Sequence, residues 1–319
     1  MRVAAQALFK VAYGRYAIGA YNVQNMEQIL GVFRGSLEAQ APVIVAVVPH
    51  ARAYAGAEML EAMMQAAEKM YPEAVYAAHL DHGDEDTCWE CLASGFYGSI
   101  MVDASHLPFE ENVAITRQVV ERAHRQGVTV EAELGVVAGL EGRSGVDEPQ
   151  AMLTDPDQAA EFVRLTGCDS LAVAIGTSHG AYKFKGQQAL HLDRLAEIQQ
   201  RLPVGFPLVL HGASSVPRAE VERINAAGGR IDSSARGVAM DDLARACQLG
   251  VTKINIHTDA LLLWTRVHRE YFRDQPDGYD FRHPGSHYMN ELARLVVHKS
   301  QQLGCANRLP EIRAALGCG

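Results

Sequence analysis

The residues best suited to chemistry lie in short polar stretches that directly follow apolar runs. One of them, HLDHGDED at residues 79 to 86, places two histidines around Asp81 and adds three further acids. Imidazoles and carboxylates are the groups that bind metals and move protons near neutral pH. The same composition is also typical of a polar strand end that is merely rich in ionisable groups. The choice between a metal and acid/base site and a plain strand end depends on the rest of the chain.

Short apolar runs recur along the whole sequence and predict a parallel sheet. They lack strict alternation of polar and apolar residues, as expected for strands buried on both faces. Helical patterns with apolar spacings of three and four separate them. Alternation of strand and helix eight times favours an α/β fold, a closed (β/α)8 TIM barrel. The eight runs cover residues 17–23, 42–48, 74–81, 98–105, 129–135, 170–176, 207–212 and 252–259, and helical patterns cover 25–40, 57–71, 109–127, 155–167 and 241–250.

A doubly wound open sheet is the alternative architecture. Such a sheet should carry a glycine-rich phosphate-binding turn after its first strand, and YNVQN is not one. The length of 319 residues suits one barrel with additions. We therefore expect a single domain over residues 1–319, with a C-terminal helical extension from about 262 to 319 that packs on the barrel or on a partner subunit.

Composition narrows the classes of partner. The 29 basic and 38 acidic residues give a net charge of −9, and no basic stripe is visible, which argues against a nucleic-acid partner. No window approaches the ~18 consecutive apolar residues of a membrane span. Six scattered cysteines and an N-terminus without signal-peptide features indicate a cytoplasmic protein. Cys88 and Cys91 form a C-x-x-C motif, but no second cysteine pair completes a zinc site. We therefore interpret them as two small residues one helical turn apart.

Polar residues occupy most of the predicted strand ends. In a TIM barrel the chemistry lies at the carboxyl ends of the strands, which meet at one mouth. Only the second strand, ending in VVPHA, lacks a clear polar candidate. Polar groups at seven of eight ends indicate a functional site. In strand order they are Asn22; Asp81 and His82; Asp103 and Ser105; Glu133; His179; His211 and Ser214; and Asn255, Thr258 and Asp259.

Three of these residues predict a metal. His82, His179 and His211 each follow an apolar strand, and three imidazoles are a zinc-type ligand set that leaves a position open for substrate. The nearby carboxylates of Asp103 and Glu133 could form a second metal position or orient the ligand imidazoles. The stretches HGASS and NIHTD offer backbone and hydroxyl donors for a phosphate. His79 lies inside its strand and is assigned to the core or to the surroundings of the site.

These residues together resemble the class II, zinc-dependent ketose-phosphate aldolases, the group of fructose- and tagatose-1,6-bisphosphate aldolases. The resemblance runs from about residue 15 to 285, and the combination of HLDHG, TSHGAYKF, HGASS and NIxTD is highly specific. The other matching stretches are YNVQNMEQ, PVIVAVVPHARAYAG, MVDASHLPFEENV, VEAELG and GVTKINIHTD.

The resemblance implies roles for individual positions. It makes His82, His179 and His211 zinc ligands, Asp103 and Glu133 an alternative metal position, and Asp81 the acid/base beside the metal. Glu141, in the loop AGLEGRSG, corresponds to a mobile glutamate that acts on the carbon acid. A monovalent cation, Na+ or K+, near the phosphate is common in the family, and we expect a homo-oligomer, a dimer or tetramer. The residues expected to hold the substrate and its C1 phosphate are Asn22, Gly180, Lys183, Gly212, Ala213, Ser214, Asn255, His257 and Thr258.

The implied reaction is reversible cleavage of a ketose phosphate between C3 and C4 to dihydroxyacetone phosphate and an aldehyde. A zinc ion would stabilise the enediolate charge. Asp81 would take the C4 hydroxyl proton, and Glu141 would return a proton to the dihydroxyacetone phosphate carbon.

Three departures from the family pattern fall on the aldehyde half. Val48 replaces a serine, His257 replaces an aspartate that is alanine in tagatose enzymes, and Leu261 replaces an arginine that can meet a C6 phosphate. The substrate is therefore either an ordinary fructose 1,6-bisphosphate or a ketose 1-phosphate with a changed distal end or C4 stereochemistry. A catalytically silent barrel that binds a partner and a zinc hydrolase are the rival functions. The presence of Asp81 and Glu141 argues against a barrel that has lost catalytic activity.

Overall fold

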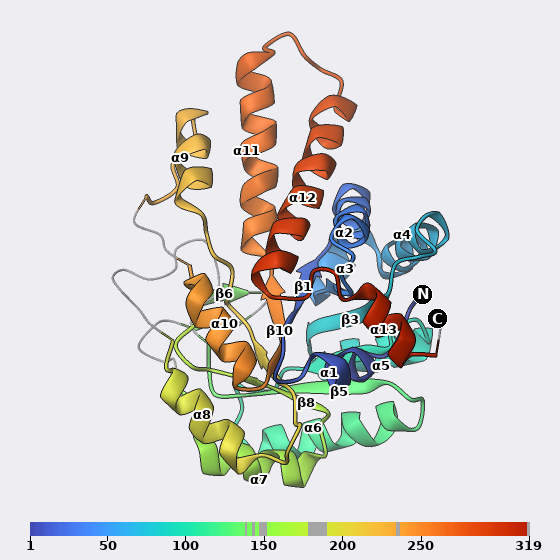
Figure 1. Ribbon diagram of the computed structural model, residues 1–319, viewed down its shortest axis with the longest axis vertical. Coiled ribbons are helices and arrows are strands. Elements are labelled where there is room, and N and C mark those ends of the chain that lie inside the picture. The colour runs from blue at the N-terminus through green and yellow to red at the C-terminus, as the bar shows by residue number, and fades with distance from the viewer. Residues whose placement is uncertain (138, 142–143, 147–151, 178–189, 234–236, 318–319) are drawn as a thin grey trace.

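The predicted apolar runs become the strands of a closed barrel (Figure 1). The computed structural model describes residues 1–137, 139–141, 144–146, 152–177, 190–233 and 237–317. Within these residues, eight parallel strands close in the order β1-β10-β9-β8-β5-β4-β3-β2. The strands are β1 (Ile18–Asn22), β2 (Val43–Val47), β3 (Tyr76–Gly83), β4 (Ser99–Val102), β5 (Thr129–Leu134), β8 (Ser170–Val173), β9 (Leu208–Leu210) and β10 (Val251–Ile256).

Burial on both faces explains why these sequences are continuous apolar runs. Every residue of β1, β2, β4 and β10 is buried, because side chains fill the barrel on one face and helices cover the other. The predicted TIM barrel is confirmed. The run expected over 252–259 ends earlier as a strand, because Thr258 already begins the next helix. A separate antiparallel hairpin pairs β6 (Gly139–Glu141) with β7 (Ser144–Val146).

Local capping sets several of the helix boundaries. The Asn25 side chain accepts a hydrogen bond from the Gln28 backbone N–H, 2.9 Å away, and so begins α2. Asp155 caps α7 in the same way, and that helix ends at Gly167 in the left-handed region. The helices around the barrel are α1 (Ala5–Ala12), α2 (Met26–Glu38), α3 (Pro49–Ala55), α4 (Ala57–Met70), α5 (Glu85–Ser94), α6 (Phe109–His124), α7 (Pro156–Thr166), α8 (Leu192–Arg201), α9 (Arg218–Ala226) and α10 (Met240–Gln248).

Three further helices form the C-terminal part of the described chain: α11 (Thr258–Asp274), α12 (Arg282–Gln302) and α13 (Leu309–Ala315). The extension was expected from about residue 262, but α11 starts directly at the mouth, four residues earlier. Figure 1 shows α11 and α12 standing side by side as a long hairpin, and α12 also packs along α2. Within the described residues, no helix is both long and apolar enough to span a membrane.

The five cysteines in the described part of the chain are buried packing residues. Cys88 and Cys91 lie buried on α5 as free thiols, and burial raises the pKa of Cys91 to about 12. A thiol with a raised pKa is a poor nucleophile and metal ligand. The C-x-x-C therefore fits two small core residues one helical turn apart.

We expect the close packing of α2 on α12 to make Gly35→Ala destabilising. A Cβ at position 35 would lie 2.5 Å from the Ala293 carbonyl oxygen, so the two helices would have to separate. Such overpacking costs about 1–3 kcal/mol, measurable by urea unfolding. Gly285→Ala on α12 is the matched control, since its Cβ would meet its nearest atom at 3.4 Å. Equal stability of the two variants would contradict this account of the interface.

Candidate active site and metal centre

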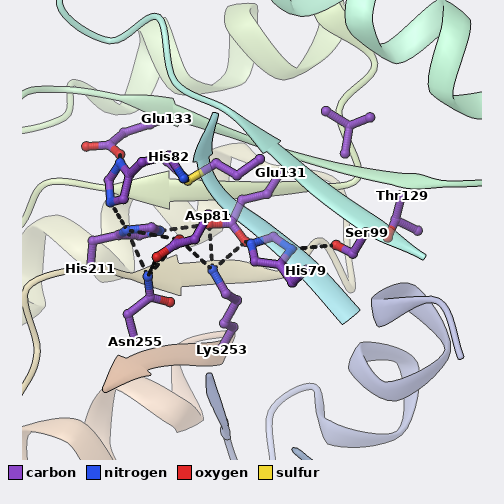
Figure 2. Close-up of polar contacts among 12 residues, drawn as sticks. His79, Asp81, His82, Ser99, Thr129, Glu131, Glu133, His211, Lys253 and Asn255 are labelled. Carbon is purple, nitrogen blue, oxygen red and sulfur yellow. Dashed lines mark hydrogen bonds and ion pairs between the residues drawn. The ribbon is translucent and has the colours of Figure 1, made fainter. Parts of the chain in front are cut away.

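A break in the register of β3 brings Asp81 and His82 to the same side. Neighbouring residues of a regular strand point to opposite faces. The pairing of β3 with β4 shifts between Leu80 and Gly83, and His82 has a positive φ of 48°. This irregularity lets both side chains reach His211, as Figure 2 shows. Only glycine fits at position 83 in this irregular pairing, because a Cβ there would lie 2.8 Å from the Met101 carbonyl oxygen.

The imidazoles of His82 and His211 meet edge to face (Figure 2). Nε2 of His82 lies 2.8 Å from Nδ1 of His211. The far nitrogen of each ring is fixed by a carboxylate: His82 Nδ1 donates to Asp103 at 2.7 Å, and His211 Nε2 donates to Glu131 at 2.7 Å. Carboxylate–imidazole pairs of this kind set the tautomer and orientation of metal-binding histidines.

Asp81 lies beside this pair and is fully buried. Its carboxylate accepts hydrogen bonds from the side-chain amides of Asn22, at 2.8 Å, and Asn255, at 2.9 and 3.0 Å. The Lys253 ammonium lies 3.8 Å away and the His211 ring 4.0 Å away. Burial alone would raise the pKa of Asp81, but the neighbouring positive charges hold it well below its usual value. Asp81 is therefore an ionised, oriented carboxylate.

The charges around the histidines are unequal. Burial lowers the pKa of His82, but Asp81 and Asp103 outweigh it and raise the pKa to about 10. Burial and the charge of His82 lower the pKa of His211. The two neighbouring imidazoles therefore differ electrostatically: carboxylates favour the charged form of His82, whereas burial and His82 disfavour the charged form of His211.

Glu133 provides a further ligand atom. Its side chain is 3% exposed, and burial followed by the charge of Asp103 raises its pKa well above the usual value. Its Oε2 is 3.9 Å from His82 Nδ1 and has no hydrogen-bond partner among the residues that the structure describes. His82, Asp103 and Glu133 form one group with metal-ligand spacing, and Asp81, His82 and His211 form another. In this arrangement Asp103 orients the His82 ring, one of the two roles that the sequence left open for it.

The loop after β9 carries the predicted phosphate-binding residues Gly212, Ala213 and Ser214. Ser214 is buried, and its Oγ accepts the backbone N–H of His257 at 3.3 Å. Thr258, also predicted, is the first residue of α11, so the positive end of a helix lies beside this loop. Backbone amides and a helix N-terminus form a suitable environment for an anion.

A buried ion pair holds this loop in place. Asp259 accepts hydrogen bonds from the Ser215 and Val216 backbone N–H groups, at 3.1 and 2.8 Å. Lys299, from α12, lies 2.8 Å from Asp259 and donates to the Ser215 hydroxyl. Burial alone would raise the pKa of Asp259, but Lys299 and the backbone donors keep it lowered. The C-terminal hairpin therefore supports the mouth of the barrel.

Several predicted residues cannot be placed in full. His179, Gly180 and Lys183 lie outside the described residues, so nothing is said of their structure. Glu141 ends β6, and only its backbone is described. The described predicted residues that converge at the mouth are Asn22, Asp81, His82, Asp103, Glu133, His211 and Asn255, joined by hydrogen bonds and ion pairs.

Sequence reasoning missed two buried charged residues beneath the histidines. Lys253 is fully buried in β10 and donates to Glu131 at 2.9 Å. A lysine in the middle of the apolar run TKINI, and a glutamate two residues before Glu133 on the same face of β5, were the available signals. His79 lies below them, with Nδ1 2.9 Å from the Ser99 hydroxyl, and burial followed by Lys253 lowers its pKa to about 3. It is a neutral core residue.

Comparison with known proteins agrees with this geometry. The family profile described as fructose-bisphosphate aldolase class-II matches residues 3–308. The chain belongs to this family. A fructose-bisphosphate aldolase of Thermus caldophilus is 45% identical, covering 92% of this chain and 94% of the relative. A fructose-bisphosphate aldolase of Treponema pallidum is 40% identical, covering 94% of this chain and 95% of the relative. The crystal structure of the YdjI aldolase from Escherichia coli K12 superposes with a TM-score of 0.77 at 30% identity, covering 97% of this chain and all of that one.

In this class II aldolase family member, we expect Lys299→Met to be strongly destabilising. The substitution leaves the Asp259 carboxylate buried without its cation, which costs about 3–5 kcal/mol. Because the pKa of Asp259 is lowered on folding, the pair stabilises the protein above the unfolded pKa. That contribution is lost as the pH falls through the folded value. Urea unfolding at pH 7 and at acidic pH should therefore show the variant's deficit shrinking with acid.

The exposed pair of Arg117 and Glu121 supplies the control for this prediction. Arg117→Met should change stability little, because exposed ion pairs contribute little. A deficit in Lys299→Met that does not diminish in acid would rule out the ion pair as its cause.

Proposed function

We propose that the protein is a zinc-dependent aldolase that reversibly cleaves a ketose phosphate, such as fructose 1,6-bisphosphate, to dihydroxyacetone phosphate and an aldehyde. The observation that carries this proposal is the pair of inward-facing nitrogens of His82 and His211, each held from behind by a carboxylate. The ionised Asp81 lies beside them. A metal next to a fixed acid/base is what cleavage of a carbon–carbon bond adjacent to a carbonyl requires.

The residues present fit a metal. The donor set consists of the imidazoles of His82 and His211, each oriented by a carboxylate, and a buried Glu133 oxygen without a partner in the described chain. Imidazole ligands at an open site are typical of catalytic zinc, and His179 would complete the set. When bound, the ion supplies Lewis-acid stabilisation of enediolate charge. A monovalent cation near the phosphate stays an expectation from the family resemblance.

Asp81 is the proposed acid/base for the C4 hydroxyl. Its two amide donors fix the orientation of the carboxylate, and Lys253 keeps it ionised, so it is ready to accept a proton. Glu141 is the proposed group for the proton on the dihydroxyacetone phosphate carbon. The support for Glu141 is its position in the sequence, in the segment that contains the β6–β7 hairpin.

The phosphate on C1 would be held by Gly212, Ala213, Ser214, Asn255 and Thr258, with Gly180 and Lys183 from the segment outside the described residues. Support comes from the loop fixed by Asp259 and from the start of α11 beside it. The alternative substrates, a ketose 1-phosphate or tagatose 1,6-bisphosphate, differ only in the aldehyde half. Leu261 is 40% exposed where an arginine was expected, which supports an altered aldehyde half.

A catalytically silent binding protein is the less favoured alternative. The described catalytic residues retain the full network of hydrogen bonds that orients them, which a silent barrel would not need. We also propose a cytoplasmic location, supported by five buried free thiols. A homo-oligomer, dimer or tetramer, is supported by the aromatic side chains of Phe272, Tyr279 and Phe281, which are more than half exposed on and near the α11–α12 hairpin.

Metal dependence is the first test of this proposal. Purified protein should bind about one zinc per chain, and exhaustive chelation should abolish release of dihydroxyacetone phosphate until zinc is restored. His211→Ala should lower zinc affinity, measured by competition with a chromophoric chelator. His298→Ala is the control, because His298 is exposed on α12, far along the chain from any strand end. Full activity after chelation would refute the metal assignment.

The two proton-transfer residues should separate kinetically. Asp81→Ala should lower the cleavage rate about 10²–10⁴-fold while zinc remains bound, because the histidines keep their carboxylate partners. Glu141→Ala should slow exchange of the dihydroxyacetone phosphate proton with solvent, followed by NMR in D2O. A wild-type exchange rate in Glu141→Ala would assign that step to another residue.

A further inference from the structure

The side chains of Gln24, His50 and His257 come together from the ends of strands that adjoin one another. The barrel order places β10, β1 and β2 side by side, and β3 with Asp81 follows β2. His257 follows β10, Gln24 follows β1, and His50 lies in the first turn of α3 after β2. The second strand, which seemed to lack a polar candidate in the sequence, therefore contributes His50 through the helix that follows it.

The rings of His50 and His257 stack on each other. Their centroids are 6.3 Å apart and their planes differ by 28°. Nε2 of His257 is 3.2 Å from the side-chain nitrogen of Gln24. Since an amide N–H donates, His257 Nε2 accepts and the ring proton lies on Nδ1. The Gln24 backbone is itself held by Gln28, at 2.7 Å.

The ring of His50 lies within the field of the proposed catalytic groups. Burial, then the proximity of His257, lowers the pKa of His50, with Asp81 opposing and His82 adding to the decrease. The His50 ring carries an N–H donor and a nitrogen acceptor, and the His257 ring carries its Nδ1 proton; these are groups of the kind that bind sugar hydroxyls. They do not offer the permanent charge that holds a phosphate in bidentate geometry.

Arg52, the cation nearest to His50 in the sequence, is not available to bind a substrate beside His50 and His257. The Arg52 guanidinium donates to the Tyr97 hydroxyl at 2.8 Å and to Glu90 at 3.3 Å, and it lies 3.6 Å from Glu61. Its side chain is 6% exposed, so it is bound into the packing of α3 and α5. At the start of α11 the chain presents Leu261 to solvent.

We propose that His50 and His257 recognise the hydroxyl groups of the aldehyde half of the substrate, so that an uncharged polyol end is accepted without a distal phosphate. The inference rests on the proposed aldolase function and names the substrate class of the same site. Gln24 acts as a positioning residue, because it fixes the tautomer and orientation of His257. Ketose 1-phosphates are then accepted as substrates, with the C1 phosphate alone supplying the charged anchor.

The test compares fructose 1-phosphate with fructose 1,6-bisphosphate. In the wild type, kcat/KM for the two should agree within about tenfold, since the described residues around His50 and His257 present no fixed cation for a second phosphate. His50→Ala and His257→Ala should each lower kcat/KM for fructose 1-phosphate about 5- to 10-fold, the effect of one lost neutral hydrogen bond. His257→Gln should recover part of the loss, because an amide keeps a donor and an acceptor, whereas His257→Leu should not.

Proton exchange of dihydroxyacetone phosphate separates failure of the pair from failure of the function. This substrate lacks the aldehyde half, so exchange in the His50 and His257 variants should fall much less than cleavage does. His298→Ala again serves as control. If both variants still exchange the dihydroxyacetone phosphate proton and cleave fructose 1-phosphate at the wild-type rate, the inference alone is overturned. A wild-type preference of about 10³-fold for the bisphosphate would also overturn it. Absence of both exchange and cleavage in the wild-type zinc enzyme would overturn the proposed function and the inference with it.

Discussion

The irregular pairing of β3 with β4 is the constraint on which the centre of this protein depends. A regular strand would send Asp81 and His82 to opposite faces, one into the barrel and one toward the helices. The shifted register and the positive φ of His82 instead turn both toward His211. A positive φ is unfavourable for a residue with a side chain, so the surrounding contacts must hold it. The hydrogen bond from His82 to Asp103 and the glycine at position 83 do so.

Charge compensation inside the barrel follows from that arrangement. Asp81 and Glu131 bring two carboxylates into a nearly dry interior, where an uncompensated charge would be costly. The buried Lys253 lies between them, 3.8 Å from one and 2.9 Å from the other. Burial alone would raise the pKa of Glu131, but Lys253 and His211 lower it to about 2. Lys253 therefore helps to keep both acids ionised, after His82 in the case of Asp81. Glu131 orients a histidine, and Asp81 is the proposed proton acceptor.

The mouth is also stabilised from outside the barrel. Asp259 and Lys299 join the loop after β9 to α12, and the close approach at Gly35 fixes α12 against α2. The C-terminal hairpin thus supports the loop proposed to bind phosphate. The residues proposed to meet the aldehyde half come instead from the first turns after three neighbouring strands.

The sequence by itself determined the barrel and most of the residues at its mouth. Continuous apolar runs separated by helical patterns require burial of both strand faces, and parallel strands bring all of their carboxyl ends to one side. Asp81, His82, Asp103, Glu133, His211 and Asn255 could be found in this way, because each directly follows or ends an apolar run. The motif match extended the prediction to residues that the structure does not describe, such as His179.

Tertiary structure alone decided which of these groups touch and in what state of charge. The pairing of His211 with Glu131, and of Lys253 with both carboxylates, joins strands that are distant in the sequence, and nothing in local spacing encodes it. The raised pKa of His82 arises from Asp81 and Asp103 together, which only the shifted register brings near the same ring. The stacking of His50 on His257 likewise follows from barrel closure, since β10 and β2 become close only when β1 lies between them. Sequence periodicity fixes the face on which a residue lies, whereas contacts across a closed barrel depend on the register of every strand between them.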